Sequence, residues 1–490
     1  MNASPRSENK RTPTGVPGLD DILGGGLPRD RIYLVQGDPG IGKTTLALQF
    51  LLAGAEAGEA CLYLTLSETK EELRTVADSH GWSLNKLSLF ELPNRGDYGE
   101  ENTMFHPSEV ELAETTKALL EEVARVKPTR VVFDSLSEIR LLSQGALRYR
   151  REVLALKQFF VGRNCTVLLL DDRTSDPGDL QLQSLAHGVL SLENLSPLYG
   201  AERRRMRVLK MRGVPFRGGY HDFALHTGGM KLFPRLVAAA DHREGFRPGE
   251  LLSGVPQIDA LAGGGLTRGT STLLMGPAGT GKSTVAIQYA KAAADAGEHA
   301  AVFTFDESTT TLLARSAGVG QNLEATIASG AIEIRQVDPA ELAPGEFTHA
   351  VRAAVEERGA RVIVIDSLNG YLHAMPEEHF LTLQLHELLT YLGQRGVITV
   401  MVVAQHGLVG ASMQSPIDVS YLADAVMVFR HVETDGQLRK AISMLKRRTG
   451  SHERTIRELS IGKAGLQVGE PMHGLQGLLT GLPTRAQDFG

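Results

Sequence analysis

Short apolar runs recur along the chain, and each ends at a glycine-rich or polar stretch. Continuous β-branched and leucine runs of this length predict strands that are buried on both faces. The stretch 44–58 and the charged amphipathic segment after 66 predict helices between them. Strands that alternate with helices indicate an α/β fold with a mostly parallel sheet and right-handed crossovers. The predicted strands are 32–37, 61–66, 131–134 and 166–172 in the first half, and 271–276, 301–306, 362–366 and 398–405 in the second.

The chain contains two copies of one domain. Residues 14–50 align without a gap with residues 253–289, at an offset of 239. A repeat of this length is a whole domain and not a solenoid unit. The mixture of proline, glycine and charge near 233–250 predicts the boundary between the copies. The predicted divisions are a flexible N-terminal tail at 1–13, a first domain at 14–240, a second domain at 241–480 and a short C-terminal tail at 481–490.

Each copy carries a GxxxxGK[ST] loop between a predicted strand and a predicted helix, which is the context of a phosphate-binding loop. Backbone N–H groups of such a loop and the start of the helix surround the phosphates of a nucleotide. Lys43 and Lys282 would reach the β- and γ-phosphates, and Thr44 and Ser283 would coordinate Mg²⁺. ATP and Mg²⁺ are therefore the expected ligands. The predicted loop residues are Gly37, Asp38, Pro39, Gly40, Ile41, Gly42, Lys43, Thr44 and Thr45, and Gly276, Pro277, Ala278, Gly279, Thr280, Gly281, Lys282, Ser283 and Thr284.

Acidic residues follow other strands of each copy. Asp134 and Asp366 end short apolar runs, and such aspartates hold Mg²⁺ through water, although a helix cap is the simpler alternative. The second strand of each copy ends in TLSE or TFDE, so that Glu68 stands alone whereas Asp306 and Glu307 form a pair. A carboxylate at the carboxyl edge of a sheet faces the ligand crevice, where it could activate a water or a hydroxyl. A solvated loop charge is the alternative.

Composition narrows the class of protein. Apolar residues make up 42% and charged residues 22% of the chain, which is typical of a globular protein. The net charge of −6 does not indicate a constitutive nucleic-acid binder. No apolar run reaches the roughly 18 residues that cross a bilayer, and the N-terminus lacks the apolar segment of a secretory signal. Cys61 and Cys165 lack metal-ligand spacing and are interpreted as buried thiols. We therefore expect a cytoplasmic location without a membrane or nucleic-acid partner.

The segments that the two copies share resemble the KaiC family, the two-domain RecA-like ATPases and autokinases of the circadian clock. The resemblance rests on the GVPxxDxLxGGGL-like runs, the FDSL and IDSL strand ends, and the LKMRG and LKRRTG segments. It extends from Thr14 to about Arg485. It implies two tandem RecA-like P-loop domains, each a mostly parallel sheet flanked by helices, in a homohexamer with ATP at the subunit interfaces.

The resemblance implies a role for four cationic residues. Lys210 and Arg212 would serve the first-domain site of the adjacent subunit, and Lys446 and Arg448 would serve the second-domain site. A cation offered by a neighbour is the arginine-finger arrangement of phosphoryl transfer. The basic run 203–212 could equally be a solvated strand edge or a DNA contact, but its likeness to the family segment favours the interface.

The resemblance also implies different activities for the two copies. In KaiC the first copy is a slow ATPase that docks partners, and the second transfers phosphate to and from hydroxyls, as a serine/threonine protein kinase. The family's adjacent hydroxyl pair aligns with Ser420 and Tyr421. Ser420 keeps the hydroxyl, whereas Tyr421 stands where the family has threonine, so a two-site phosphorylation cycle does not follow. A plain helix with an exposed serine and tyrosine is the alternative.

The resemblance also indicates which partners to expect, and two alternative functions remain open. A KaiB-like partner on the first domain is compatible with the resemblance, and the short end PTRAQDFG predicts no KaiA-type activator. Clock-like or stress signalling is the expected context. A nucleotide-gated scaffold and a RecA-like DNA repair ATPase are the alternatives. A eukaryotic-type protein kinase is excluded because HRD-like and DFG segments do not occur in order.

Overall fold

The computed structural model divides the chain into two compact units, Met1–Arg235 and Leu236–Gly490. We call them the first and the second domain and describe each by itself. The positions at which the predicted domains end stay predictions, and the predicted tails lie largely outside the described residues. The structure describes residues 11–92, 107–143, 145–172, 181–197, 199–240, 245–373, 380–405, 420–434, 436–473, 475–476 and 484–485.

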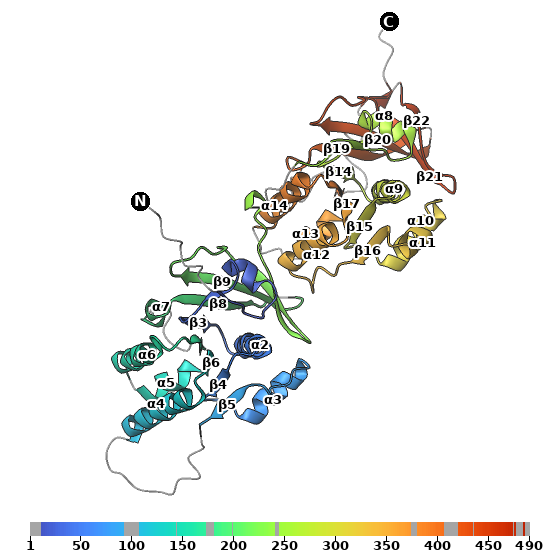
Figure 1. The fold of residues 1–490 in the computed structure, drawn as a ribbon. Helices are drawn as coiled ribbons and strands as arrows, with labels where there is room; N and C mark the ends of the chain where they lie inside the picture. Colours follow the sequence, from blue (N-terminus) through green and yellow to red (C-terminus); the bar gives the residue numbers. More distant parts are fainter. Residues whose placement is uncertain are drawn as a thin grey trace, which may run out of the picture. The chain divides into compact units, whose positions relative to one another are not determined.

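The first domain is built around a nine-stranded sheet in the order β11-β10-β9-β8-β3-β7-β6-β4-β5 (Figure 1). The six strands from β8 to β5 are parallel, and β9, β10 and β11 extend the sheet as antiparallel strands. Every residue of β3, β4 and β6 is buried, as expected for central strands. The strands are β3 (Ile32–Gln36), β4 (Cys61–Thr65), β5 (Ser88–Glu91), β6 (Arg130–Asp134), β7 (Thr166–Asp171), β8 (Gly188–Leu195), β9 (Arg203–Met211), β10 (His221–His226) and β11 (Gly229–Phe233), with a separate ribbon of β1 (Arg11–Thr12) and β2 (Leu27–Pro28).

Helices cover both faces of this sheet (Figure 1). One core cluster joins α1, α2 and α3 to one face, and a second joins α4, α5 and α6 to the other. This two-sided cover explains why the central strands are apolar throughout. The helices are α1 (Leu19–Leu23), α2 (Lys43–Glu56), α3 (Lys70–Ser79), α4 (Pro107–Val126), α5 (Leu136–Ser143), α6 (Ala146–Phe160) and α7 (Gln181–Leu185).

The second domain repeats this architecture with the sheet order β16-β15-β17-β18-β14-β19-β20-β21-β22. Its central strand β14 again lies between two parallel neighbours. The strands are β14 (Ser271–Gly276), β15 (His299–Thr304), β16 (Ile332–Gln336), β17 (Ala360–Asp366), β18 (Ile398–Ala404), β19 (Ala425–Thr434), β20 (Gln437–Arg447), β21 (Arg457–Gly462) and β22 (Gly465–Pro471), with the short pairs β12 (Glu250–Leu251) and β13 (Leu266–Thr267), and β23 (Leu475–Gln476) and β24 (Thr484–Arg485).

Two core clusters again lie on opposite faces, one with α8 and α9 and one with α12, α13 and α14. The helices are α8 (Pro256–Ala262), α9 (Lys282–Asp295), α10 (Thr309–Gly318), α11 (Glu324–Ala328), α12 (Pro344–Glu356), α13 (Leu368–His373) and α14 (Leu381–Gln394), with the 3₁₀ turn η2 (Ala238–Ala240). Within the described part of the chain, every helix is too short or too polar to span a membrane.

The repeat in the sequence is a repeat of local contacts. Asp20 Oδ1 accepts from the backbone N of Thr14 at 3.0 Å, and Asp259 Oδ1 accepts from the backbone N of Ser253 at 2.7 Å. Both aspartates thus fasten the turn that leads into the domain.

The α/β class and the tandem domains predicted from the sequence are confirmed. Each predicted strand is present, but the sequence pattern did not predict the antiparallel strands that widen each sheet. Their side chains alternate between buried and partly exposed positions, as in β9, so they lack the continuous apolar runs of the central strands.

Candidate active site

The carboxyl ends of four neighbouring strands meet at one edge of the first-domain sheet. In the spatial order β3-β7-β6-β4 these ends lead to the phosphate loop, Asp172, Asp134 and Glu68. The order β14-β18-β17-β15 brings the second loop, Ala404, Asp366 and Glu307 together in the same way. Ligands of open α/β sheets bind at this edge.

The loops 37–45 and 276–284 lie between strand and helix, as predicted. Lys43 Nζ donates to the carbonyls of Gly37 and Asp38, both at 2.9 Å, and Lys282 Nζ donates to the carbonyl of Pro277 at 2.6 Å. Each lysine begins a 14-residue helix whose N-terminus points its free N–H groups at the loop. Both lysine side chains are 6% exposed, so the loops hold them at the site.

Glycine is required immediately before each lysine. Gly42 has a φ of 107° and Gly281 a φ of 102°, which L side chains rarely adopt. A Cβ on Gly281 would also lie 2.4 Å from a methyl of Ile461. The backbone turn that opens the loop toward a phosphate therefore depends on these two positions.

The predicted metal-binding residues contact each other in pairs. Thr44 Oγ1 donates to Asp134 Oδ2 at 3.2 Å, and a side-chain hydrogen bond links Ser283 to Asp366. Burial raises the pKa of both aspartates. No group of three or more His, Cys, Asp or Glu side chains forms a metal site among the described residues. A hydroxyl and one carboxylate fit Mg²⁺, which takes its remaining oxygens from phosphates and water.

Tyr63 distinguishes the first-domain site from the second. Its hydroxyl donates to Asp134, and complete burial raises the pKa of Tyr63 well above its usual value. The phenol therefore remains a proton donor that orients this carboxylate. The matching residue of the second domain is Val302, at the same offset of 239, which has no hydroxyl.

Glu68 is the predicted catalytic acid of the first domain. Burial raises its pKa to about 7, with further contributions from the carboxylates of Asp134, Glu72 and Asp172, whereas Lys43 opposes them. Its Oε2 is buried and makes no hydrogen bond to any described residue. The structure thus places at the carboxyl edge a carboxyl group that changes protonation near neutral pH.

The two predicted acids of the second domain are held by neighbours. Glu307 forms a forked ion pair with Arg315, with distances of 3.1 Å from Nε to Oε1 and 2.9 Å from Nη2 to Oε2. Asp306 Oδ2 accepts from the hydroxyl of Ser367. The acids occupy the same edge as Glu68 but have different partners.

Asp172 is a site residue that the sequence analysis missed. Its Oδ1 lies 2.7 Å from Lys43 Nζ, and its Oδ2 accepts from the hydroxyls of Ser135 and Ser137, both at 3.2 Å. These donors lower its pKa despite partial burial. The available signal was the acidic pair at the end of the run TVLLLDD, which the second domain replaces with Val403 and Ala404.

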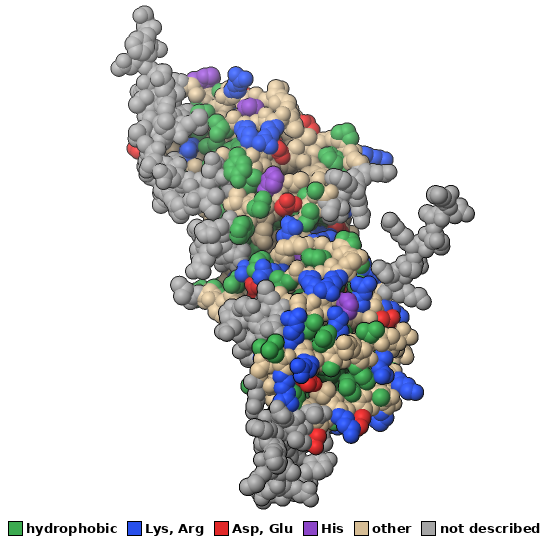
Figure 2. Space-filling model, turned by 90° about the vertical axis from the view of Figure 1, so that its left-hand side faces the viewer, with side chains coloured by type: hydrophobic (Ala, Val, Ile, Leu, Met, Phe, Trp, Pro, Cys, Tyr) green, Lys and Arg blue, Asp and Glu red, His purple; other side chains and the backbone are tan. Residues whose placement is uncertain are grey.

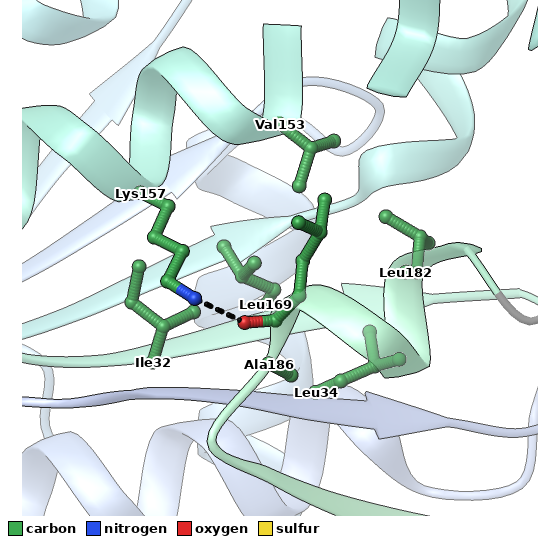
Figure 3. Close-up of a pocket in the computed structure, with 8 residues that line it drawn as sticks. Ile32, Leu34, Val153, Lys157, Leu169, Leu182 and Ala186 are labelled. Carbon is green, nitrogen blue, oxygen red and sulfur yellow. Dashed lines mark hydrogen bonds between the residues drawn. The ribbon is translucent and has the colours of Figure 1, made fainter. Parts of the chain in front are cut away.

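The predicted interface cations of the first domain meet at helix α7. Lys210 Nζ and Arg212 Nη2 donate to the carbonyls of Gln183 and Ser184, the latter at 2.8 Å. Lys157 Nζ donates to the carbonyl of Leu185 at 2.8 Å (Figure 3). The apolar cavity beside Lys157 measures about 10 Å³, which is too small for a nucleotide. The three cations therefore hold α7 in place, and the cavity lies beside this helix.

The second-domain cations hold the turn that carries the predicted phosphoacceptors. Lys446 Nζ donates to the carbonyls of Ser420 at 3.1 Å and Ala423 at 2.8 Å. Arg448 Nη2 donates to the carbonyl of Tyr421 at 2.9 Å. Ser420 is partly buried, and the side chain of Tyr421 is 56% exposed. The segment that precedes Ser420 lies outside the described residues.

Comparison with known proteins agrees with this arrangement. The family model of the KaiC ATPase matches residues 12–237 and again residues 251–473. The circadian clock oscillator protein KaiC of Thermostichus vulcanus is 25% identical over 489 residues, which cover 98% of this chain and 93% of that protein. The circadian clock protein KaiC3 of Synechocystis sp. is 24% identical over 483 residues, covering 96% of this chain and 94% of that protein.

The two matches of the family model together cover most of the chain, and each coincides with one sheet and its phosphate loop. Both sheets are mostly parallel and flanked by helices, as in RecA-like domains. The chain therefore belongs to the KaiC family of ATPases, with the ATP-binding domain of that family present twice.

Proposed function

We propose that this chain hydrolyses ATP in both domains and phosphorylates itself in the second. One observation carries the proposal: each domain brings a loop lysine, a hydroxyl–aspartate pair and an acid to one sheet edge. These are the parts that phosphoryl transfer needs, because its catalysis consists of positioning and charge stabilisation. Bound Mg²⁺ would neutralise charge that develops on the phosphates.

The residues divide this work between them. Lys43 and Lys282, whose partners among the described residues are loop carbonyls and, for Lys43, Asp172, would bind the β- and γ-phosphates. Thr44 with Asp134, and Ser283 with Asp366, would hold Mg²⁺. The acid would take a proton from the attacking oxygen.

The differences between the acids support different tasks. Glu68 has no hydrogen-bond partner at Oε2 among the described residues and a pKa of about 7, which suits the activation of water. The pair of Asp306 and Glu307 suits a protein hydroxyl as the attacking group, since one acid can hold the hydroxyl and the other can accept its proton. We propose Ser420 as the acceptor and Tyr421 as the alternative.

Exposed apolar side chains support assembly into a ring with ATP between subunits. Leu141, Leu147 and Val161, on and beside α5 and α6, are 72%, 82% and 72% exposed. In the second domain Phe380 and Leu383, at the start of α14, are 66% and 57% exposed. Figure 2 shows Lys and Arg side chains among hydrophobic ones on the first-domain face. A head-to-tail contact that uses matching helices of both domains closes into a ring when the rotation permits.

In this ring the four interface cations would leave their carbonyl partners and reach the neighbour's phosphates. A ring of six is proposed by analogy with the KaiC relatives, as are clock-like or stress signalling, a cytoplasmic location and a KaiB-like partner. No KaiA-type activator is proposed. Lys446 and Arg448 donate to the carbonyls of Ser420 and Tyr421, which supports an acceptor in this turn.

The proposal is tested by incubation of the purified chain with ATP and Mg²⁺, followed by intact-mass and phosphopeptide analysis. We expect a phosphate on Ser420 or Tyr421 that is lost in Glu307→Gln and retained in Glu68→Gln. ATP consumption without a retained phosphate would leave an ATPase and refute the autokinase part. Phosphate that persists in Glu307→Gln would refute the role of this acid.

A further inference from the structure

The acid turns of the two domains, residues 65–68 and 304–307, have one backbone conformation but different side-chain surroundings. Thr65 Oγ1 donates to the carbonyl of Glu68 at 2.6 Å, and Thr304 Oγ1 donates to the carbonyl of Glu307 at 2.8 Å. The two glutamates therefore leave the backbone at equivalent points of the sheet edge. Any difference in their chemistry comes from the residues that face them.

The largest difference lies one helix away. Arg315, in the last turn of α10, faces Glu307 and forms the forked ion pair with it. At the offset of 239 the first domain has Val76, a partly buried residue that packs on the apolar core. The arginine is thus an element of the second domain alone.

We propose that Arg315 is a positioning residue whose fork restrains both oxygens of Glu307, so that the second domain hydrolyses ATP more slowly than it would without the fork. This inference rests on the proposed role of Glu307 as the base.

The geometry supports a restraint on both carboxylate oxygens. The two bonds of the fork engage Oε1 and Oε2 together, and the exposed fractions of the two side chains are only 28% for Arg315 and 24% for Glu307. Bidentate pairs of this kind are strong and directional.

Arg315 is itself fixed to the helix of the phosphate loop. Its Nη1 donates to Thr284 Oγ1 at 3.3 Å, and Thr284 is buried. Glu307 and Asp306 both contribute to the raised pKa of Asp366, so the three carboxylates belong to one site. Glu307 is therefore tied through Arg315 to α9, and its reach toward an attacking water depends on the release of this contact.

The hydrolytic step that is restrained is balanced. A water oxygen forms a bond to the γ-phosphorus, the bond between that phosphorus and the bridging oxygen of ADP breaks, and the water gives a proton to Glu307. The proton then passes to the released phosphate or to solvent. Because the fork of Arg315 engages both oxygens of Glu307, it must open before this proton transfer, and the other atoms of the step are unchanged.

The test uses the full-length chain with Lys43→Ala, which silences the first domain. Arg315→Val gives the second domain the residue of the first, and Arg315→Lys keeps the charge without the fork. Arg358→Val is the matched control, since Arg358 forms a similar pair with Glu333 at 2.7 Å in the same domain. Single-turnover phosphate release is measured against pH for each variant, and thermal melting checks that each is folded.

We expect Arg315→Val to raise the release rate roughly three- to tenfold. Arg315→Lys should give an intermediate rate, and Arg358→Val should match the parent. A rate in Arg315→Val that is unchanged or lower, while Glu307→Gln abolishes release, overturns this inference and leaves the proposed function intact. Release that persists in Glu307→Gln overturns both.

Discussion

The protonation state of Glu68 predicts how ATP hydrolysis by the first domain depends on pH. Hydrolysis is measured in Lys282→Ala, which removes the second-domain contribution, across the range from about pH 6 to about pH 8. With the pKa of Glu68 raised to about 7 by burial and by the nearby carboxylates, about one tenth of this group is ionised at pH 6 and about nine tenths at pH 8. A base acts only when ionised, so the rate should rise about tenfold across this range.

Asp172 and two buried histidines of the first domain do not produce this profile. The donors to Asp172 lower its pKa, so it stays ionised throughout. His187 and His221 have pKa values lowered to about 4 by burial, outside the range. Glu68→Gln, which keeps the shape of the side chain, should flatten the profile and lower the rate roughly a hundredfold or more.

The same shift fixes the pH dependence of stability. The pKa of Glu68 in the folded chain lies above the value of 4.5 in the unfolded chain, so the folded state binds the extra proton. Its contribution to stability is present below pH 4.5 and is lost as the pH rises through about 7. Glu68→Gln should therefore remove part of the fall in melting temperature between these values.

A hydrolysis rate that is flat with pH, or a pH profile that survives in Glu68→Gln, would refute the assignment of Glu68 as the base of the first domain.

Three further perturbations test the surroundings of the sites. Asp172→Ala, which copies Ala404, should tighten ATP binding to the first domain severalfold in a fluorescence titration of Lys282→Ala, because the carboxylate 2.7 Å from Lys43 competes with the phosphates; unchanged affinity would contradict this. Arg130→Met should lower the free energy of unfolding by about 3 kcal/mol in urea titrations, because it removes a buried guanidinium together with its ion pair to the partly buried Glu59; a loss near zero would show that the pair is replaceable. Chelation by EDTA should stop hydrolysis without lowering the melting temperature.

The parts of the fold that the sequence predicted are those encoded locally. Central strands such as β3 and β6 are continuous apolar runs, and the phosphate loops carry their glycines and lysines within nine residues. The antiparallel strands were not predicted because their burial alternates, as in β9. Local patterns therefore predict the parallel core better than its extension.

The site was predicted in its parts but not in its contacts. Asp134 and Glu68 stand at visible strand ends, whereas the pair of Lys43 and Asp172 joins residues that lie far apart in the sequence. The fork between Arg315 and Glu307 joins the last turn of α10 to the acid turn that precedes this helix. Such contacts follow from tertiary packing, and neither residue alone signals them.

In the proposed function, Glu68 and Glu307 serve two separate ATP-hydrolysing sites. The most direct test is steady-state ATP hydrolysis by the parent chain, Glu68→Gln, Glu307→Gln and the double variant, with the fold of each checked by melting temperature. We expect a larger loss for Glu68→Gln than for Glu307→Gln, and a fall of the double variant to roughly one hundredth of the parent rate or less. A double variant that keeps the parent rate would contradict the proposed roles of both acids.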